Sequence, residues 1–473
     1  MNQRRLPSRP FALAALAALL AAPLGAQEGG SQFGLARSRE LAELGVLPSS
    51  RDVVVRDLLN YHRHRLPLPT AGRDVALELR FDRPAAQVGD DVWLQVGYTT
   101  APLGDRSLAP ACAVALVVDC SGSMAGAAKM TAVKAGLRAF VDRLRADDEV
   151  TLVTFSTQAQ LAAPRQRRGD GRWLHDAIER LAPEANTNLH AGLMLGLREL
   201  SRRDGPAARR VLLLTDGIAN TGVTAPDEIA AAARPLAAEG IDISTIGVGQ
   251  DLDVPLLQRL AGDARGLFHF VADPQDVAKV FVQEADSLVA PVARQVALSV
   301  ELPRGLSLLQ VPHDGVTVHG NRLDVRLADL NAGFTGVLLV HGRVLADSAD
   351  GLAAAAALTF RSAARGRDDV VRADARLELA PRRASGHGMG PSSGFDVEVR
   401  KNAAIAVLAQ GLADMAQAAE QKRWADADRV LRLASDDAQR LFPGDDQDVQ
   451  RVRTIVQGHL QTLGRYVDRF REL

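Results

Sequence analysis

The spacing of apolar residues changes several times along the chain. In four short runs, apolar residues alternate with polar or small ones, as in strands of an antiparallel sheet that buries one face. These runs are 75–81, 92–98, 296–302 and 323–327. The pattern therefore predicts a β segment over residues 73–110 and a second β domain over residues 291–380.

Between these two regions, continuous apolar runs alternate with helical segments. Residues 113–118 are apolar throughout, which is typical of a strand that is covered on both faces. Further strands of this kind are expected at 150–155, 211–214, 241–248 and 267–271. Helical spacing is found at 127–145, 173–181, 189–200, 226–239, 254–261 and 276–288. Strands that alternate with helices predict a doubly wound, mainly parallel α/β domain over residues 111–290.

The remaining segments have weaker patterns. Residues 27–72 are expected to be a low-order segment with one short helix near 52–61, ended by a proline-rich stretch. Residues 381–394 are rich in Gly, Ser and Pro, which predicts a flexible linker. Residues 395–473 are expected to be a helical region, with helices at 399–420, 424–441 and 449–470. Because the ends of an inserted domain lie close together, we hypothesise that the two β segments form one sandwich.

The first 26 residues have the layout of a secretory signal peptide. Arg4, Arg5 and Arg9 precede an apolar run at 11–22, and the small residues of 23–26 offer a cleavage site. The run is shorter than the roughly 20 residues that a membrane-spanning helix needs, and no later stretch is apolar enough to span a bilayer. We therefore expect an exported protein, periplasmic or extracellular, with a short N-terminal anchor as the alternative.

Composition excludes several classes of protein. With 473 residues, 47% hydrophobic and 24% charged, the chain is in the range of globular proteins of about three folding units. A net charge of −1 argues against a nucleic-acid partner. Cys112 and Cys120 are the two cysteines; on one extended strand they would be about 26 Å apart, too far for a disulfide. Both are expected to be free thiols.

Oxygen-bearing side chains follow the predicted strands of the α/β domain. Asp119, Ser121 and Ser123 come directly after the first strand, Thr187 precedes a helix, and Asp216 ends a later strand. Open α/β sheets bind ligands at the carboxyl ends of their strands. Hydroxyl and carboxylate oxygens are the ligands that a hard dication such as Mg²⁺ prefers. The sequence therefore predicts a divalent-metal site at this edge.

These residues, in this order, resemble the von Willebrand factor type A domain, a Rossmann-like fold, and its metal-ion-dependent adhesion site. The D-x-S-x-S motif of that site is present in Asp119, Ser121 and Ser123, and the resemblance covers about residues 111–290. It implies that Ser121, Ser123 and Thr187 bind Mg²⁺, or Mn²⁺ or Ca²⁺ in its place, directly. Asp119 and Asp216 would act largely through water, and a partner's carboxylate would complete the shell.

Two further features bear on the resemblance. Ala185-Asn186 stands where Gly-Gly is common before the threonine, which alters the shape of the loop but removes no ligand. The segment Asp57-Leu-Leu-Asn-Tyr61 resembles one that precedes the type A domain in exported bacterial proteins, which also carry a β region and a helical tail after it.

The resemblance favours a non-enzymatic binding or adhesion protein whose metal captures an acidic group on a protein or other macromolecule. One alternative is a scaffold in which the metal only braces the loops. A metal-assisted hydrolase is the weakest hypothesis. Phosphatases with an Asp at the end of the first strand usually have the motif D-x-D, and here Ser121 occupies the position of the second Asp. Ser123 also lies outside a G-x-S-x-G elbow and has no identifiable His base.

Other candidate residues have simpler interpretations. His62 and His64 have the spacing of a metal-binding pair, but we expect them in a solvated loop with no acidic partner nearby. His190 is interpreted as a residue at a helix start, and Trp173 and Trp424 as packing residues. Residues 165–168 form a small basic cluster that is expected in an exposed loop.

Overall fold

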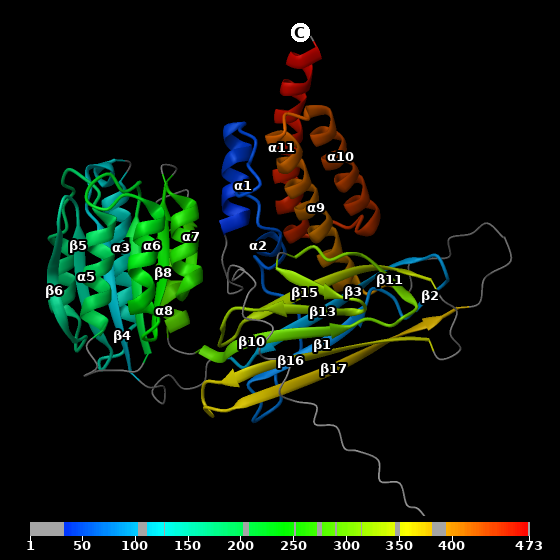
Figure 1. The fold of residues 1–473 in the computed structure, drawn as a ribbon, viewed down its shortest axis with the longest axis horizontal. Coiled ribbons are helices and arrows are strands. Elements are labelled where there is room, and N and C mark those ends of the chain that lie inside the picture. Colours follow the sequence, from blue (N-terminus) through cyan, green and yellow to red (C-terminus); the bar gives the residue numbers. More distant parts are fainter. Residues whose placement is uncertain are drawn as a thin grey trace, which may run out of the picture.

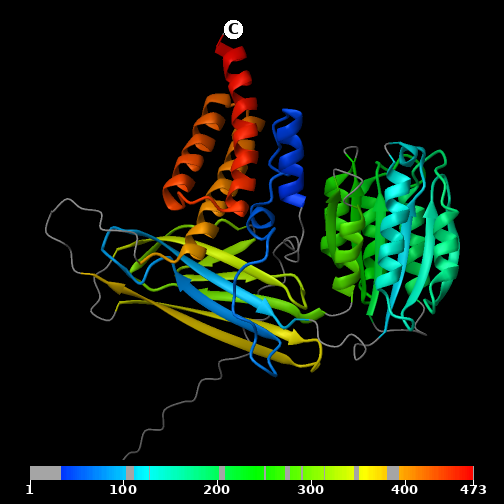
Figure 2. The same ribbon diagram turned by 180° about the vertical axis from the view of Figure 1, so that it is seen from behind.

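The computed structural model describes residues 33–102, 111–126, 128–201, 208–249, 252–271, 277–288, 291–313, 315–345, 351–380 and 394–471. The predicted signal peptide and nearly all of the predicted linker lie outside the described residues. Figures 1 and 2 show an α/β domain beside a β-sandwich, which carries a bundle of helices on one face. None of the helices in the described ranges combines the length and hydrophobicity that a bilayer crossing requires.

The α/β domain has a six-stranded sheet with helices on both faces. Its strands are β4 (Cys112–Asp119), β5 (Glu149–Phe155), β6 (Ala159–Arg167), β7 (Ala208–Thr215), β8 (Ile241–Val248) and β9 (Arg265–Val271). The order is β6-β5-β4-β7-β8-β9, and every adjacent pair except β5–β6 is parallel. One face packs α3 (Lys129–Arg143), α4 (Arg172–Glu179) and α8 (Val277–Leu288); the other packs α5 (Leu189–Ser201), α6 (Pro226–Ala237) and α7 (Val254–Asp263). The predicted doubly wound, mainly parallel sheet is confirmed.

The central strand β4 shows why its sequence is apolar throughout. Val114, Leu116 and Val118 pack with α3, α4 and α8, whereas Ala113 and Val117 pack with the helices on the opposite face. Since successive side chains of a strand point to opposite faces, a strand with helices on both faces needs apolar residues at every position.

The edge strand β6 was not predicted. It pairs antiparallel with β5, and most of its residues are exposed. Its sequence therefore has no continuous apolar run. The basic cluster that we expected in a loop begins on this strand, and Arg165 donates a hydrogen bond to Glu149 from Nε over 2.6 Å. Pro164 on the same strand is typical of an edge, because a proline cannot donate to a neighbouring strand.

The β-sandwich combines segments from both sides of the α/β domain. One sheet has the order β1-β3-β15-β11, formed by β1 (Val75–Phe81), β3 (Asp91–Thr100), β15 (Thr335–Val344) and β11 (Leu306–Gln310). The other contains β2 (Ala85–Ala86), β10 (Pro291–Glu301), β12 (Val316–His319), β13 (Arg322–Arg326), β14 (Leu330–Asn331), β16 (Leu352–Ser362) and β17 (Asp368–Leu379). Because β3 pairs with β15 over nine residues, the α/β domain is inserted into one sandwich, in agreement with the sequence-based hypothesis.

The helical region stands on the outer face of the β3–β15 sheet. It consists of α9 (Val397–Glu420), α10 (Trp424–Leu441) and α11 (Gln447–Arg471). Trp93 of β3 and Val337 and Leu339 of β15 belong to the same buried cluster as these helices. The sheet is therefore covered on one face by the second sheet and on the other by the bundle.

The N-terminal segment is more ordered than we expected. Residues Phe33–Leu44 form a helix, α1, which packs against both α11 and β9 and lies between the bundle and the α/β domain (Figures 1 and 2). Leu41 and Ser38 are buried there, and Arg37 lies over the ring of Phe270. The helix is stabilised by these contacts between domains, which the local sequence does not reveal.

The histidine pair is buried, which corrects our expectation of a solvated loop. His62 and His64 follow the short helix α2 (Val55–Leu59) and lie under the bundle. Their acidic neighbour comes from the start of α11, where an Asp448 oxygen is 3.9 Å from His62 Nε2. Asn60 fixes the segment that carries the histidines to the β-sandwich. Its side-chain amide exchanges two hydrogen bonds with the backbone of Val337, as a residue of a neighbouring strand would.

Candidate metal site

The predicted metal ligands lie at the carboxyl edge of the α/β sheet. Asp119 is the last residue of β4 and is fully buried. Its Oδ1 accepts a hydrogen bond from the Ser121 backbone N–H (2.8 Å), and its Oδ2 accepts one from the Thr215 hydroxyl (2.6 Å). Burial raises the pKa of Asp119 to about 6. Both carboxylate oxygens therefore hold the loop after β4 against the end of β7.

The two serines of this loop lie close to Asp216, the residue that follows β7. The loop continues as a 3-10 turn, Gly122–Ala125. The Ser121 and Ser123 hydroxyl oxygens are 3.0 Å apart, and Ser123 Oγ donates to Asp216 Oδ1 over 2.6 Å. Ser121 and Asp216 are buried, whereas Ser123 is exposed. Three of the five predicted ligands thus form a continuous row of oxygens, and its middle residue, Ser123, is exposed to solvent.

Thr187 enters the site from the loop before α5. Its backbone N–H donates to the Asn220 side chain (2.9 Å), and the Asn220 N–H donates to the Thr187 carbonyl (3.1 Å). A Cβ atom at Gly217 would lie 3.8 Å from the Thr187 hydroxyl and 3.7 Å from the Ser123 hydroxyl. Both hydroxyls therefore lie close to Gly217, which brings Thr187 to the same edge of the sheet as Ser123.

Gly122 allows the loop after β4 to approach the loop that contains Glu184 and Ala185. A Cβ atom there would lie 2.9 Å from the Glu184 carbonyl oxygen, closer than such atoms pack. The loops are joined through their backbones, from Glu184 N–H to the Cys120 carbonyl and from Gly122 N–H to the Ala185 carbonyl. Because this contact is formed by backbone groups, a side chain at Ala185, where glycine is common, leaves it intact.

Lys129 is the residue of the site that sequence reasoning missed. It is the first residue of α3, and its Nζ lies 2.6 Å from Asp216 Oδ2. A lysine at the start of a helix carries no distinctive signal. Only the fold reveals that its partner is 87 positions further along the chain.

The donor set fits a hard dication. Oxygens bound at about 2.0–2.1 Å in an octahedron are about 2.9 Å apart, close to the 3.0 Å between the two serine hydroxyls. In the described part of the chain, no group of three or more His, Cys, Asp or Glu residues is arranged to hold a metal, so a metal here would depend on the Ser and Thr hydroxyls. Burial raises the pKa of the Cys120 thiol to about 12, so this neighbour supplies no thiolate at neutral pH. Cys112 and Cys120 are both free, as expected, and both are buried.

Residues 113–283 match the family model described as the von Willebrand factor type A domain. The chain contains a type A domain. This agrees with the sheet order and with the resemblance drawn from the motif residues.

Related proteins and structures share this domain. The uncharacterized protein YfbK of Escherichia coli (strain K12) is 25% identical over 277 residues, which are 56% of this chain and 48% of that protein. The inter-alpha-trypsin inhibitor heavy chain H2 of Sus scrofa is 24% identical over 236 residues, 47% of this chain and 25% of that protein. The chain thus spans about half or less of these relatives.

A solved structure shows the same fold over more than the type A domain. The von Willebrand factor type A protein from Catenulispora acidiphila has a TM-score of 0.50 at 17% identity and covers 77% of this chain and 86% of its own. At this identity the likeness concerns the fold alone.

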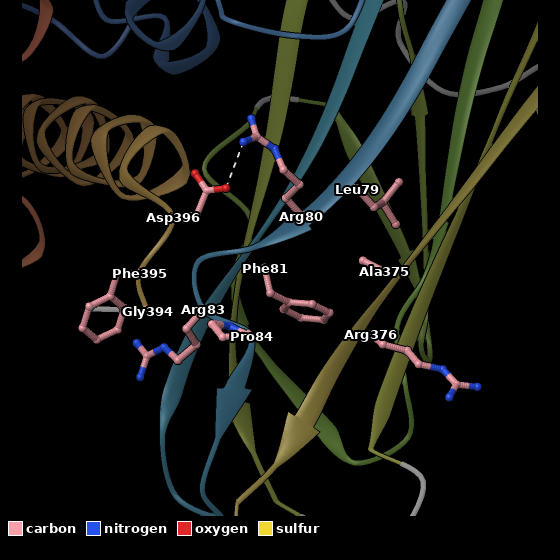
Figure 3. A pocket seen from close by; sticks show the side chains of 10 residues that line it. All are labelled: Leu79, Arg80, Phe81, Arg83, Pro84, Ala375, Arg376, Gly394, Phe395 and Asp396. Atoms are coloured by element: carbon pink, nitrogen blue, oxygen red, sulfur yellow. Dashed lines mark hydrogen bonds and ion pairs between the residues drawn. The ribbon is translucent and has the colours of Figure 1, made fainter. Parts of the chain in front are cut away.

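A cavity of about 490 Å³ lies between β1, β17 and the start of α9 (Figure 3). None of the five predicted ligands lines it. Two of its arginines are neutralised by neighbouring acids, Arg80 by Asp396 (2.9 Å) and Arg83 by Asp82 (2.9 Å). These two ion pairs lie within the protein, and the cavity is separate from the oxygens at the edge of the type A sheet.

Proposed function

We propose that this chain is an exported, non-enzymatic binding protein that captures an acidic group of a macromolecular partner at a divalent-metal site. The observation that carries the proposal is the convergence of Ser121, Ser123 and Asp216 within 3.0 Å steps, with the Thr187 hydroxyl close to Gly217, as that of Ser123 is. Type A relatives support it, one of which is by name a heavy chain of a trypsin inhibitor.

Each residue has a distinct part in this proposal. Ser121, Ser123 and Thr187 would bind the metal through their hydroxyls, and Asp216 would hold the Ser123 hydroxyl in place. Asp119 fixes the loop through its hydrogen bonds to Ser121 and Thr215. The bound metal would supply uncompensated positive charge, to which a carboxylate binds more strongly than to an exposed lysine.

We further propose Mg²⁺ as the natural metal, and export directed by residues 1–26. Oxygen ligands with only two carboxylates suit Mg²⁺ or Mn²⁺. Mass spectrometry of the mature protein from the native host would show Gln27 as the first residue. Retention of Arg4 and Arg5 in the mature protein would favour the anchored form instead.

A binding role is favoured over hydrolysis by the contacts of the serines. Ser123 donates to Asp216 and faces Ser121, and in the described part of the chain no histidine is hydrogen-bonded to either serine. A histidine base is the commonest means of activating a serine nucleophile. The contacts of Ser123 therefore support a binding role.

Partner capture tests the proposal directly. The immobilised full chain is exposed to envelope and secreted fractions of the native host with Mg²⁺ and then with excess EDTA. We expect partners that are released by EDTA and are not captured by Ser121→Ala. Ser299→Ala, on β10 of the sandwich, is the matched control. Capture that persists in EDTA and in Ser121→Ala, with unchanged melting curves, would favour the scaffold hypothesis.

A further inference from the structure

The contact between Lys129 and Asp216 divides the Asp216 carboxylate between two partners. Oδ1 accepts the Ser123 hydroxyl, and Oδ2 accepts the Lys129 ammonium, each over 2.6 Å. The Asp216 side chain is fully buried and that of Lys129 is 20% exposed. A pair this close and this sheltered from water is charge-assisted and resists screening by salt.

The Lys129 ammonium also lies close to the turn after β8. A Cβ atom at Gly249, in the turn after β8, would lie 3.5 Å from Lys129 Nζ. Gly249 also has φ +89°, a conformation that favours glycine. Lys129 therefore reaches from the start of α3 across the end of β7 to the end of β8, and its ammonium stays beside the candidate metal ligands.

The charge of this group of residues is set by the lysine. Asp119 and Asp216 supply two negative charges when ionised, and Lys129 supplies one positive charge. Without the lysine, both carboxylates would attract a bound dication and no positive group nearby would repel it. With the lysine present, one oxygen of Asp216 is already paired with the ammonium, and the ammonium repels the dication.

We propose that Lys129 is an internal counterion that competes with the divalent metal for Asp216 and so weakens metal binding. The inference rests on the proposed function of the site. Before the metal binds, the ammonium compensates the buried Asp216 carboxylate, which would otherwise be costly to bury. When the metal binds, the ammonium must share Asp216 or withdraw toward solvent. Lys129 thus acts through Asp216 as a positioning residue.

Calorimetric titration of the metal-free full chain with Mn²⁺ tests this inference. Lys129→Met keeps the length of the side chain and removes its charge, so Mn²⁺ should bind about tenfold more tightly or better. Lys129→Arg keeps the charge and should stay close to the wild type. Lys134→Met removes a charge from the same helix, at a side chain that donates to a backbone carbonyl of Glu179, and should change affinity less than about twofold.

Thermal melting provides a second readout. Lys129→Met leaves the buried Asp216 carboxylate without its ammonium, so the metal-free variant should melt below the wild type. Saturating Mn²⁺ should remove most of that difference. A lysine that only packs would lower the melting temperature equally with and without Mn²⁺ and would not raise metal affinity.

The outcomes separate this inference from the proposed function. If neither the wild type nor Lys129→Met takes up Mn²⁺, the metal site itself is wrong. If only Lys129→Met takes up Mn²⁺, the lysine blocks the site and the inference is supported. If both bind Mn²⁺ with equal affinity, or the variant binds more weakly, the inference is overturned and the metal site stands.

Discussion

Two regions of this molecule bring a lysine together with acidic side chains, and they differ in how those groups are satisfied. At the edge of the type A sheet, Lys129 meets Asp216 beside hydroxyls that reach solvent at Ser123. Under the bundle, Lys401 is only 7% exposed and lies 3.3–3.9 Å from Glu398, Asp446 and Asp448.

The two clusters therefore favour different roles. In the first, the Lys129–Asp216 pair lies beside serine and threonine hydroxyls, and the exposed Ser123 suits a ligand from outside. The second lies where α9, α11 and the segment after α2 meet, and its groups face one another. Changes to the hydroxyls of the first should lower metal affinity more than stability, and changes in the second should lower stability with little effect on metal affinity.

The largest expected effect is on metal affinity. Ser121→Ala combined with Ser123→Ala removes two proposed ligands, so Mn²⁺ affinity should fall about 1000-fold, which corresponds to about 4 kcal/mol. The free energy of unfolding in EDTA should fall by about 1–3 kcal/mol, less than the loss in binding free energy, because Ser123→Ala removes a donor to a buried Asp216 oxygen. Calorimetry and denaturant titration measure the two quantities. A loss of stability without a loss of Mn²⁺ affinity would contradict the binding role that we assign to the first cluster.

The next effect is a pH dependence of the bundle. His459 of α11 is buried, its Nε2 lies 3.0 Å from the Ser38 carbonyl of α1, and burial lowers its pKa to about 4. An unfolded histidine titrates near 6.5, so the unfolded chain binds the proton more tightly between pH 6.5 and 4. The contribution is therefore intact above pH 6.5 and lost as pH falls through 4, by about 3 kcal/mol.

Denaturant titrations at pH 7 and at pH 4.5 measure this dependence. In His459→Gln, which keeps a donor toward Ser38, the fall in stability over this window should be smaller than in the wild type. An equal fall in both proteins would assign the pH dependence to other groups.

Asn60→Ala should weaken the junction between the sandwich and the N-terminal segment. The Asn60 amide donates to the Val337 carbonyl, accepts from the Val337 N–H over 2.8 Å, and lies 3.0 Å from His64 Nε2. Loss of these bonds leaves buried backbone groups unpaired, at a cost of about 2 kcal/mol. Asn321→Ala, in an exposed turn, is the control. Mn²⁺ affinity should stay unchanged, and a drop in affinity would show that the two regions are coupled.

The smallest expected effect comes from the loop contact at Gly122. In Gly122→Ala the new methyl group meets the Glu184 carbonyl, so the loops must separate, and Mn²⁺ affinity should fall about tenfold, or about 1.4 kcal/mol. Gly262→Ala, in α7, has open space at the same position and should be neutral or stabilising by up to about 1 kcal/mol. Unchanged affinity in Gly122→Ala would mean that the close approach does not shape the site.

The sequence predicted the α/β region well, because a sheet buried on both faces requires short apolar runs such as 113–118, and helices are usually longer than such a run. The site residues were predictable as a set, because each follows an expected strand or precedes an expected helix. Whether they bind metal stays a prediction. The sandwich could be hypothesised from strand alternation, but the pairing of β3 with β15 could not be read from either segment alone.

The features that were missed depend on contacts between distant segments. α1 is stabilised by α11 and β9, and His62 is covered by residues at the start of α11. No feature of the sequence distinguishes Lys129 from other lysines at helix starts. Its contact with Asp216, the residue after β7, is created by the fold. In each case the deciding partner lies far away in the chain, where the local pattern carries no information.

The shared β3–β15 sheet also constrains the order in which the protein assembles. Residues 91–99 must wait for residues 335–343 before their pairing can form. Between them the ribosome makes the whole type A domain, whose sheet uses only its own strands. That domain can therefore reach its native state first and hold the two halves of the sandwich close together. The insertion thus works as a short tether that replaces a long and entropically costly loop.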